Sequence, residues 1–147
     1  MARIILGPGE GATVWLGTTE TSIKVDRALS NGLLFMAEHV FAPGFEGPPA
    51  HIHPDMDHTF YVVEGTARFV VDGQESTGGP GTSAFVSRGT PHTWGNASDT
   101  PARLIEINVP GGFEEYYAEL SRALPQGAPP DPETIRGIMQ RHGILPA

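Results

Sequence analysis

Cysteine is absent from this chain of 147 residues. Disulfide bonds, thiolate nucleophiles, zinc–thiolate sites and iron–sulfur clusters are therefore excluded. Any metal ion would have to be held by His, Asp or Glu side chains or by backbone oxygen atoms. The six histidines consequently become the first residues to examine.

Long hydrophobic runs are also lacking. No apolar stretch approaches the roughly 20 residues that a membrane-spanning helix needs. The N-terminal sequence MARIILGPGEG has too few consecutive aliphatic residues for the core of a signal peptide. We therefore expect a protein that does not span a membrane and is not exported, with the cytoplasm as its location.

Basic residues are scarce, at nine Lys and Arg against 17 Asp and Glu, which gives a net charge of -8. They form no cluster, so we expect neither a nucleic-acid partner nor attraction to a membrane surface. A hydrophobic share of 39% supports one domain with its own core. A small-molecule substrate is the expected partner.

Short β-type runs separated by glycine and proline dominate the first three quarters of the chain, which holds 19 Gly and 14 Pro in all. This pattern predicts an all-β antiparallel sandwich or barrel. The apolar run 32–42 fits a helix or a strand equally well. The clearest strand candidates are 58–64, 66–72, 83–87, 90–95 and 102–109.

The C-terminal part changes to helical periodicity, with apolar residues of 112–124 recurring on one helix face. Asp131 followed by Pro132 predicts the start of a second helix. We therefore predict a barrel domain over residues 1–111. Residues 112–147 are expected to form a helical extension that packs on the barrel or on a dimer partner.

Three histidines fall within one stretch, HIHPDMDH, that begins at His51. His51 and His53 share one face if the chain is extended. Pro54 predicts a turn, after which His58 can point back toward the same spot. His92 follows another turn-forming proline. Four imidazoles on converging strands are a candidate site for one divalent metal ion.

The first of these segments resembles a motif of the cupin superfamily, in which H-x-H is followed by Glu and then Gly. Here four residues separate His53 from His58, and six more lead to Gly65. His58 thus stands where most cupins of this pattern carry a glutamate ligand.

A second segment resembles the other cupin motif, which contains P-x-G, His and Asn at fixed spacing. Gly81, Gly89, His92 and Asn96 match it, and Ser87 replaces the usual proline. The helical tail also resembles that of small quercetinase-like cupins. The resemblance implies a single-domain cupin jelly-roll β-barrel with short C-terminal helices. The metal ligands that it implies are His51, His53, His58 and His92.

Neutral imidazole ligands suit Fe, Cu, Ni, Co or Zn. With three histidines and one glutamate, a bound dication would keep a formal charge of +1, whereas four neutral histidines would leave +2 and a stronger Lewis acid. We expect one divalent transition metal as the cofactor, and Fe or Cu if the protein is an oxygenase.

Strand parity suggests which residues line a substrate pocket. Phe60 and Trp94 share faces with neighbouring histidines, and one of Phe35 and Met36 should face inward. Such a lining suits a small aromatic or polyketide-like substrate. Glu106, on the last predicted strand, is a candidate catalytic base.

These features predict a metal-dependent cupin that acts as a dioxygenase on a small aromatic or enolic compound of flavonol or polyketide type. One alternative is a non-redox, metal-dependent isomerase or cyclase, which would turn over without dioxygen. Another is a cupin that binds a small molecule without catalysis. A homodimer is expected, because jelly rolls with exposed edge strands often pair.

Overall fold

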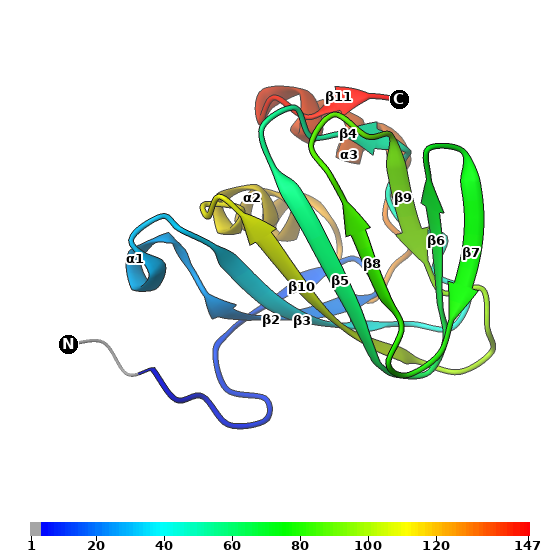
Figure 1. Cartoon of the computed structure of the whole chain (residues 1–147), viewed down its shortest axis with the longest axis horizontal. Helices are drawn as coiled ribbons and strands as arrows, with labels where there is room; N and C mark the ends of the chain where they lie inside the picture. The colour runs from blue at the N-terminus through cyan, green and yellow to red at the C-terminus, as the bar shows by residue number, and fades with distance from the viewer. Residues whose placement is uncertain (1–3) are drawn as a thin grey trace.

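The computed structural model describes residues 4–147 as two facing antiparallel sheets with three helices (Figure 1). The first three residues of the predicted barrel domain lie outside the described part. The strands are β1 (Ala12–Leu16), β2 (Thr19–Val25), β3 (Phe35–Phe41), β4 (His51–Ile52), β5 (Asp57–Glu64), β6 (Ala67–Val71), β7 (Gln74–Gly78), β8 (Ser83–Val86), β9 (His92–Gly95), β10 (Ala102–Val109) and β11 (Leu145–Pro146).

The two sheets have the strand orders β1-β2-β3-β10-β5-β8 and β11-β4-β9-β6-β7. Several neighbours in these orders are far apart in the sequence, such as β3 and β10 or β4 and β9, which is the pattern of a jelly roll. The predicted fold class, an all-β jelly roll with short C-terminal helices, is confirmed. The helices are α1 (Arg27–Ser30), α2 (Glu114–Ala123) and α3 (Pro132–Arg141).

The run 32–42, which fitted either a helix or a strand, forms β3. This strand is hydrogen-bonded on both sides, to β2 and to β10. Tertiary pairing of this kind decides between two local preferences that are nearly equal. Its inward positions alternate strictly, and the buried residues are Phe35, Ala37, His39 and Phe41.

Helix α2 packs against β1 of the six-stranded sheet and against α3, and α3 also contacts β11 of the five-stranded sheet. The Asp131 side chain accepts a hydrogen bond from the Thr134 amide and caps α3 as the sequence indicates. Each large apolar side chain buried here contributes roughly 1.5–3 kcal/mol. The buried cluster that joins the helices to β3 contains Phe35, Ala37, Phe113, Tyr116, Tyr117, Leu120, Leu124, Ile135, Ile138, Met139 and Ile144.

A second apolar cluster lies between the two sheets. It contains Phe41, Phe60, Val62, Ala67, Phe69, Trp94, Ala102 and Leu104. The inward positions between the two clusters are polar: on β3 the residue is His39, on β5 it is His58, and on β10 it is Glu106. The interior therefore contains a polar layer bounded by apolar clusters.

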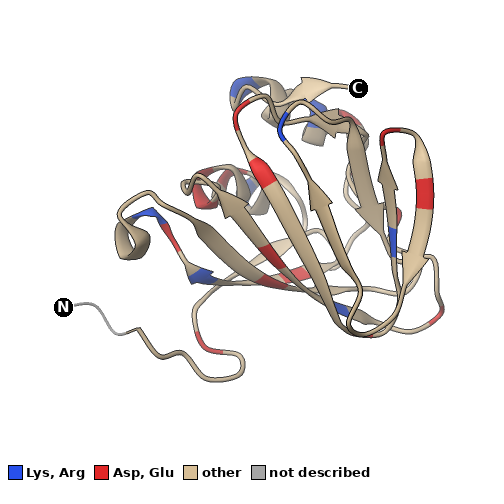
Figure 2. Cartoon of the chain, viewed as in Figure 1, with Lys and Arg blue, Asp and Glu red and all other residues tan. Residues whose placement is uncertain are grey.

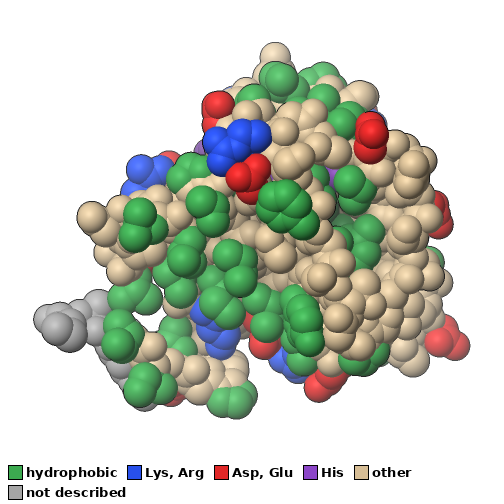
Figure 3. Space-filling view, in the orientation of Figure 1, with side chains coloured by type: hydrophobic (Ala, Val, Ile, Leu, Met, Phe, Trp, Pro, Cys, Tyr) green, Lys and Arg blue, Asp and Glu red, His purple; other side chains and the backbone are tan. Residues whose placement is uncertain are grey.

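The outer surface carries few strong features. Acidic and basic residues are interspersed along the elements in the view of Figure 2, without a continuous basic band. Large apolar side chains are exposed on the outer face of β5, β8 and β10 (Figure 3), among them Tyr61, Phe85 and Ile107. None of the helices within residues 4–147 is long and apolar enough to cross a membrane. The homodimer stays a prediction.

Two glycines before the histidine stretch offer a matched test of backbone packing. Both have a left-handed backbone, with φ of 70° at Gly44 and 87° at Gly47. A Cβ atom on Gly44 would meet nothing within 4 Å, whereas one on Gly47 would lie 1.6 Å from the backbone oxygen of Trp94. Gly47 therefore permits the close approach of this loop to β9.

We expect Gly44→Ala to lower the free energy of unfolding by about 1–2 kcal/mol, the strain of a left-handed alanine. Gly47→Ala should lower it by considerably more, because the backbone of Trp94 must also move. Urea unfolding of both variants measures this difference. Equal losses would show that the loop moves away from β9 without resistance.

Candidate metal centre

Three of the predicted ligands converge in the polar layer. His51 on β4 lies directly opposite His92 on β9, and His53 follows the end of β4. One ligand nitrogen from each of the three lies within 4.8 Å of the other two. All three side chains are buried. A single ion between them would be within reach of three imidazoles from the same sheet.

Backbone carbonyls fix the orientation of two of these rings. His51 Nδ1 donates to the carbonyl of Pro49 at 2.7 Å, and His92 Nδ1 donates to that of Thr90 at 2.9 Å. In both cases the carbonyl lies two residues before the histidine. This places the proton on Nδ1 and leaves the Nε2 lone pair for a metal, as in many metal-binding histidines.

Two ring nitrogens of this group have no hydrogen-bond partner among the described residues. Nε2 of His53 and Nε2 of His92 are buried without a hydrogen bond. Buried polar atoms of this kind normally have a partner, so their pairing with an ion is the simplest explanation. The residues present therefore fit a bound transition metal.

Burial keeps these histidines neutral. It lowers the pKa of His51 to about 3, with a further contribution from the nearby His92. Burial also lowers the pKa of His92 to about 4 and shifts that of His53 in the same direction. A neutral imidazole is the form that binds metals, so the rings need no deprotonation near neutral pH.

The fourth predicted ligand, His58, adjoins this group without belonging to the set of three. Its ring centroid is 4.2 Å from that of His53 and 5.3 Å from that of His92. His58 comes from β5, in the opposite sheet, and is fully buried. Neither of its ring nitrogens has a hydrogen-bond partner.

Glu106, the candidate base, is fully buried behind His58. One carboxylate oxygen lies 3.7 Å from His58 Nδ1 and the other lies 3.6 Å from His39 Nε2. The Tyr117 hydroxyl donates to the carboxylate at 3.0 Å. Burial alone would raise the pKa of Glu106, but the His39 and His58 imidazoles lower it below its ordinary range. Glu106 is therefore a buried carboxylate.

His39 is a member of this network that the sequence reading missed. Its Nδ1 lies 2.8 Å from the Thr21 hydroxyl on β2, and its Nε2 faces Glu106. Strand parity in 35–41 was the available signal, because it puts His39 on the same face as Phe35. That signal was not usable while a helix remained an equal alternative for this run.

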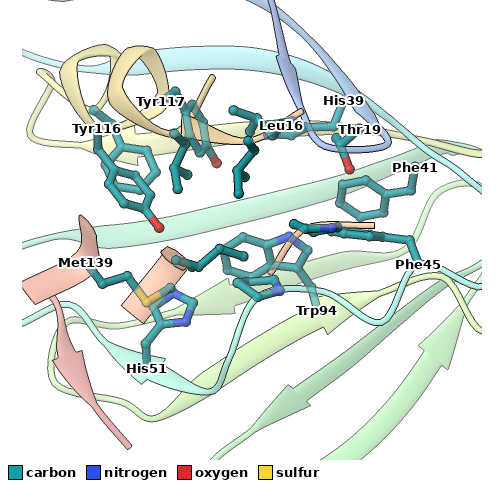
Figure 4. A pocket seen from close by; sticks show the side chains of 16 residues that line it. Leu16, Thr19, His39, Phe41, Phe45, His51, Trp94, Tyr116, Tyr117 and Met139 are labelled. Carbon is teal, nitrogen blue, oxygen red and sulfur yellow. The ribbon is translucent and has the colours of Figure 1, made fainter. Parts of the chain in front are cut away.

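A small cavity lies between the polar layer and the helices (Figure 4). His39 and His51 lie on opposite sides of it, and Trp94, Tyr117 and Met139 are among its aromatic and apolar lining residues. Its volume is about 50 Å³. Pockets for larger ligands need about 300–1,000 Å³, so a substrate of more than one ring requires part of the lining to move outward.

The predicted pocket residues occupy different places. Trp94 lines the cavity. Phe60 is buried beside it, with ring centroids 4.8 Å apart, and Phe35 packs against Tyr117 on α2, so both support the lining from behind. Of the pair Phe35 and Met36, Phe35 is the inward residue, and Met36, also named as a pocket candidate, lies on the other face of β3 because side chains alternate along a strand.

Comparison with known proteins agrees with this architecture. A family model described as "Cupin domain" matches residues 37–108, which contain both histidine segments. An RmlC-like cupin from Shewanella frigidimarina superposes with a TM-score of 0.66 at 23% identity, over 78% of this chain and 96% of that one. This chain belongs to the cupin superfamily.

Two further proteins of different kinds resemble this chain. KdgF from Halomonas sp. superposes with a TM-score of 0.67 at 17% identity, over 78% of this chain and 99% of that one. The tetracenomycin polyketide synthase protein TcmJ of Streptomyces glaucescens is 34% identical over 71 residues, which are 48% of this chain and 47% of that protein. The chain thus matches about half the length of this curated relative.

Removing one ligand from this cupin should abolish metal retention. We expect His92→Ala to lower the affinity for Zn²⁺ or Co²⁺ by more than the roughly 10–100-fold that loss of a supporting residue costs. His142→Ala, at a histidine paired with Glu119 near the end of α3, is the control. Metal content after dialysis, measured by mass spectrometry, checks this. Equal retention in the two variants would contradict a three-histidine site.

The free energy of unfolding of the metal-free cupin should decrease as the pH is lowered below about 6.5. The folded state keeps His51 and His92 neutral down to pH values of about 3 and 4, whereas unfolded histidine takes up a proton near 6.5. Between these values the unfolded state binds more protons. Stability is therefore complete above pH 6.5 and falls as the pH drops, by about 1.4 kcal/mol per pH unit for each such histidine.

Urea unfolding at several pH values between about 6.5 and 5 measures this slope. In His51→Gln one titrating group is gone, so its slope should be smaller by about one histidine's share. An identical slope in the variant and the parent protein would show that His51 is protonated in the folded state.

Proposed function

We propose that this cupin is a metal-dependent dioxygenase that acts on a small aromatic or enolic compound of flavonol or polyketide type. The observation that carries the proposal is the group of His51, His53 and His92, buried and neutral, at the wall of an aromatic-lined cavity. Neutral nitrogen ligands suit Fe or Cu, which are the metals that react with dioxygen.

The residues of the chain would hold the metal ion, exclude water from the site and orient the substrate. His51, His53 and His92 would hold the ion at the edge of the cavity, since His51 belongs to both. When bound, the ion would supply Lewis acidity and, for Fe or Cu, redox chemistry with dioxygen. The apolar lining would exclude water, which strengthens electrostatic interactions in the site and suppresses side reactions.

The shape of the cavity supports a flat substrate with few polar groups. Trp94, Phe41 and Tyr116 offer ring faces and edges to an aromatic ligand. Glu106 does not line the cavity, so it would not take a proton from the substrate directly. Ionisation of an enol or phenol would then depend on the ion and not on a neighbouring carboxylate.

A second candidate function is supported by the similarity to TcmJ. That relative is described as a polyketide synthase protein, and the matching part includes about half of each chain. A metal ion held by neutral histidines can also polarise a carbonyl group for cyclisation or isomerisation, without any change of oxidation state. Zn²⁺ or Ni²⁺ would serve in that case, and dioxygen would not be consumed.

Dioxygen uptake separates the two functions. We expect the Fe²⁺- or Cu²⁺-loaded protein to consume dioxygen with at least one member of a panel containing a flavonol, a catechol and a cyclic 1,3-diketone. An oxygen electrode measures uptake, and mass spectrometry identifies the product.

His53→Ala, loaded in the same way, should lose this uptake, and His142→Ala should keep it. Product formation under strict anaerobiosis, without uptake in air, would overturn the dioxygenase and support the cyclase or isomerase. Tight binding of the panel without any product under either condition would support a cupin that only binds a small molecule.

A further inference from the structure

The cupin motif places a carboxylate at the position of His58, and this chain has none there. The neighbouring strand supplies one. On the inner face of the sheet, β5 and β10 pair so that Asn108 lies opposite His58 and Glu106 lies opposite Phe60. Glu106 is therefore the diagonal cross-strand neighbour of His58, a distance that long side chains reach.

The contacts fix the Glu106 carboxylate on the Nδ1 side of the His58 ring. Its Oε2 atom is 3.7 Å from His58 Nδ1. Tyr117 donates its hydroxyl to both carboxylate oxygens, at 3.0 and 3.2 Å, and His39 faces Oε1 at 3.6 Å. The carboxylate thus accepts the Tyr117 hydroxyl and lies close to one ring nitrogen each of His39 and His58.

We propose that Glu106 is a positioning residue that supplies, from β10 and from behind His58, the negative charge that the cupin motif provides through a glutamate ligand. The inference rests on the proposed metal-dependent function. It assigns His58 as a fourth nitrogen donor whose orientation and electron density are set by Glu106.

The chemistry of the pair follows from the geometry. A carboxylate next to Nδ1 favours the tautomer with the proton on that atom, which leaves the lone pair on Nε2. Such carboxylate–histidine pairs orient a ligand ring and raise its basicity. The sequence alone predicted an uncompensated +2 charge for four neutral histidines. With Glu106 behind His58, the buried group as a whole returns to +1.

Buried polar atoms without hydrogen-bond partners around His58 indicate that an ion or a water molecule binds at this place. Nε2 of His58 is buried without a hydrogen bond, and so are both polar atoms of the Asn108 side chain opposite it. An amide and an imidazole left unsatisfied at the same place would each cost about 1–3 kcal/mol. An ion beside His58 would satisfy the imidazole and leave the amide to a bound water.

A different role for Glu106 is to anchor α2 to the barrel through Tyr117. The two roles differ in what happens when a glutamate is put back at position 58. An anchor is indifferent to residue 58. If Glu106 replaces the charge of the motif glutamate, its effect depends on residue 58. With a glutamate at position 58, Glu106 would face a second buried carboxylate and repel it.

The test is a double-mutant cycle with His58→Glu and Glu106→Gln. The first measurement is the melting temperature of the metal-free proteins. We expect Glu106→Gln to lower the melting temperature when residue 58 is His, because an attractive pair is lost. In the His58→Glu background the same substitution should raise it, because a repulsive pair is relieved. This reversal of sign is the expected signature.

The second measurement is the affinity for Co²⁺. It is determined from the visible absorption of bound Co²⁺ in competition with a chelator. Glu106→Gln should weaken binding by about 10–100-fold. The double variant, which restores the motif's three histidines and one glutamate, should bind within about tenfold of the parent protein. Glu38→Gln, at an outward glutamate of β3 paired with Arg103, is the matched control and should leave affinity unchanged.

The outcomes are distinguishable. A fall in melting temperature in both backgrounds, with unchanged Co²⁺ affinity in Glu106→Gln, would overturn the inference and make Glu106 an anchor for α2. In that case normal metal binding by the parent protein would leave the proposed function intact. If the parent protein itself binds no metal, the proposed function fails. The sign of the melting-temperature change would then still decide whether Glu106 and His58 form a charge-coupled pair.

Discussion

Imidazole rings buried without hydrogen-bond partners are the feature on which the rest of this structure depends. His39, His53, His58 and His92 each have at least one buried ring nitrogen with no partner in the protein. Each such atom costs about 1–3 kcal/mol, a sizeable share of the net stability of a domain. The two apolar clusters on either side of the polar layer offset this cost. An occupant would remove much of it, so binding and folding stability are coupled in this chain.

The jelly roll assembles this layer from both of its sheets. The three converging histidines come from β4, the residue after it and β9, and these two strands are neighbours in the five-stranded sheet. His58, Glu106 and His39 come from β5, β10 and β3, which are neighbours in the six-stranded sheet. One sheet therefore supplies the three converging histidines, and the other supplies His58 and the carboxylate. The distance between the sheets, set by the packing of Phe41, Phe60 and Trp94, decides whether the two halves meet.

The sequence predicted the parts of this arrangement that depend on local spacing. The interval between His51 and His53, and the turn prolines near His58 and His92, are read directly from the residues. Glu106 was also within reach, because it alternates with Ala102 and Leu104 on the inward face of β10. Its partners were not, since the neighbour of β10 is set by strand order and no local pattern reveals it. The sequence left open which of Phe35 and Met36 faces inward for a related reason: parity fixes which residues share a face but not which face is inward. The cavity was beyond prediction, because it arises where α2 and α3 meet the sheet.

Helix α2 connects the substrate side of the site to its charged side. Tyr117 lines the cavity and also donates its hydroxyl to Glu106. The cavity holds about 50 Å³, so a ligand with more than one ring must displace part of the lining, of which α2 is one element. Movement of α2 would lengthen or break the hydrogen bond from Tyr117 and leave the carboxylate to its two imidazole neighbours. The attraction between Glu106 and His58 would then strengthen, because one of the competing donors has left. A ligand that displaced α2 would therefore change the surroundings of the Glu106 carboxylate through this single hydroxyl group.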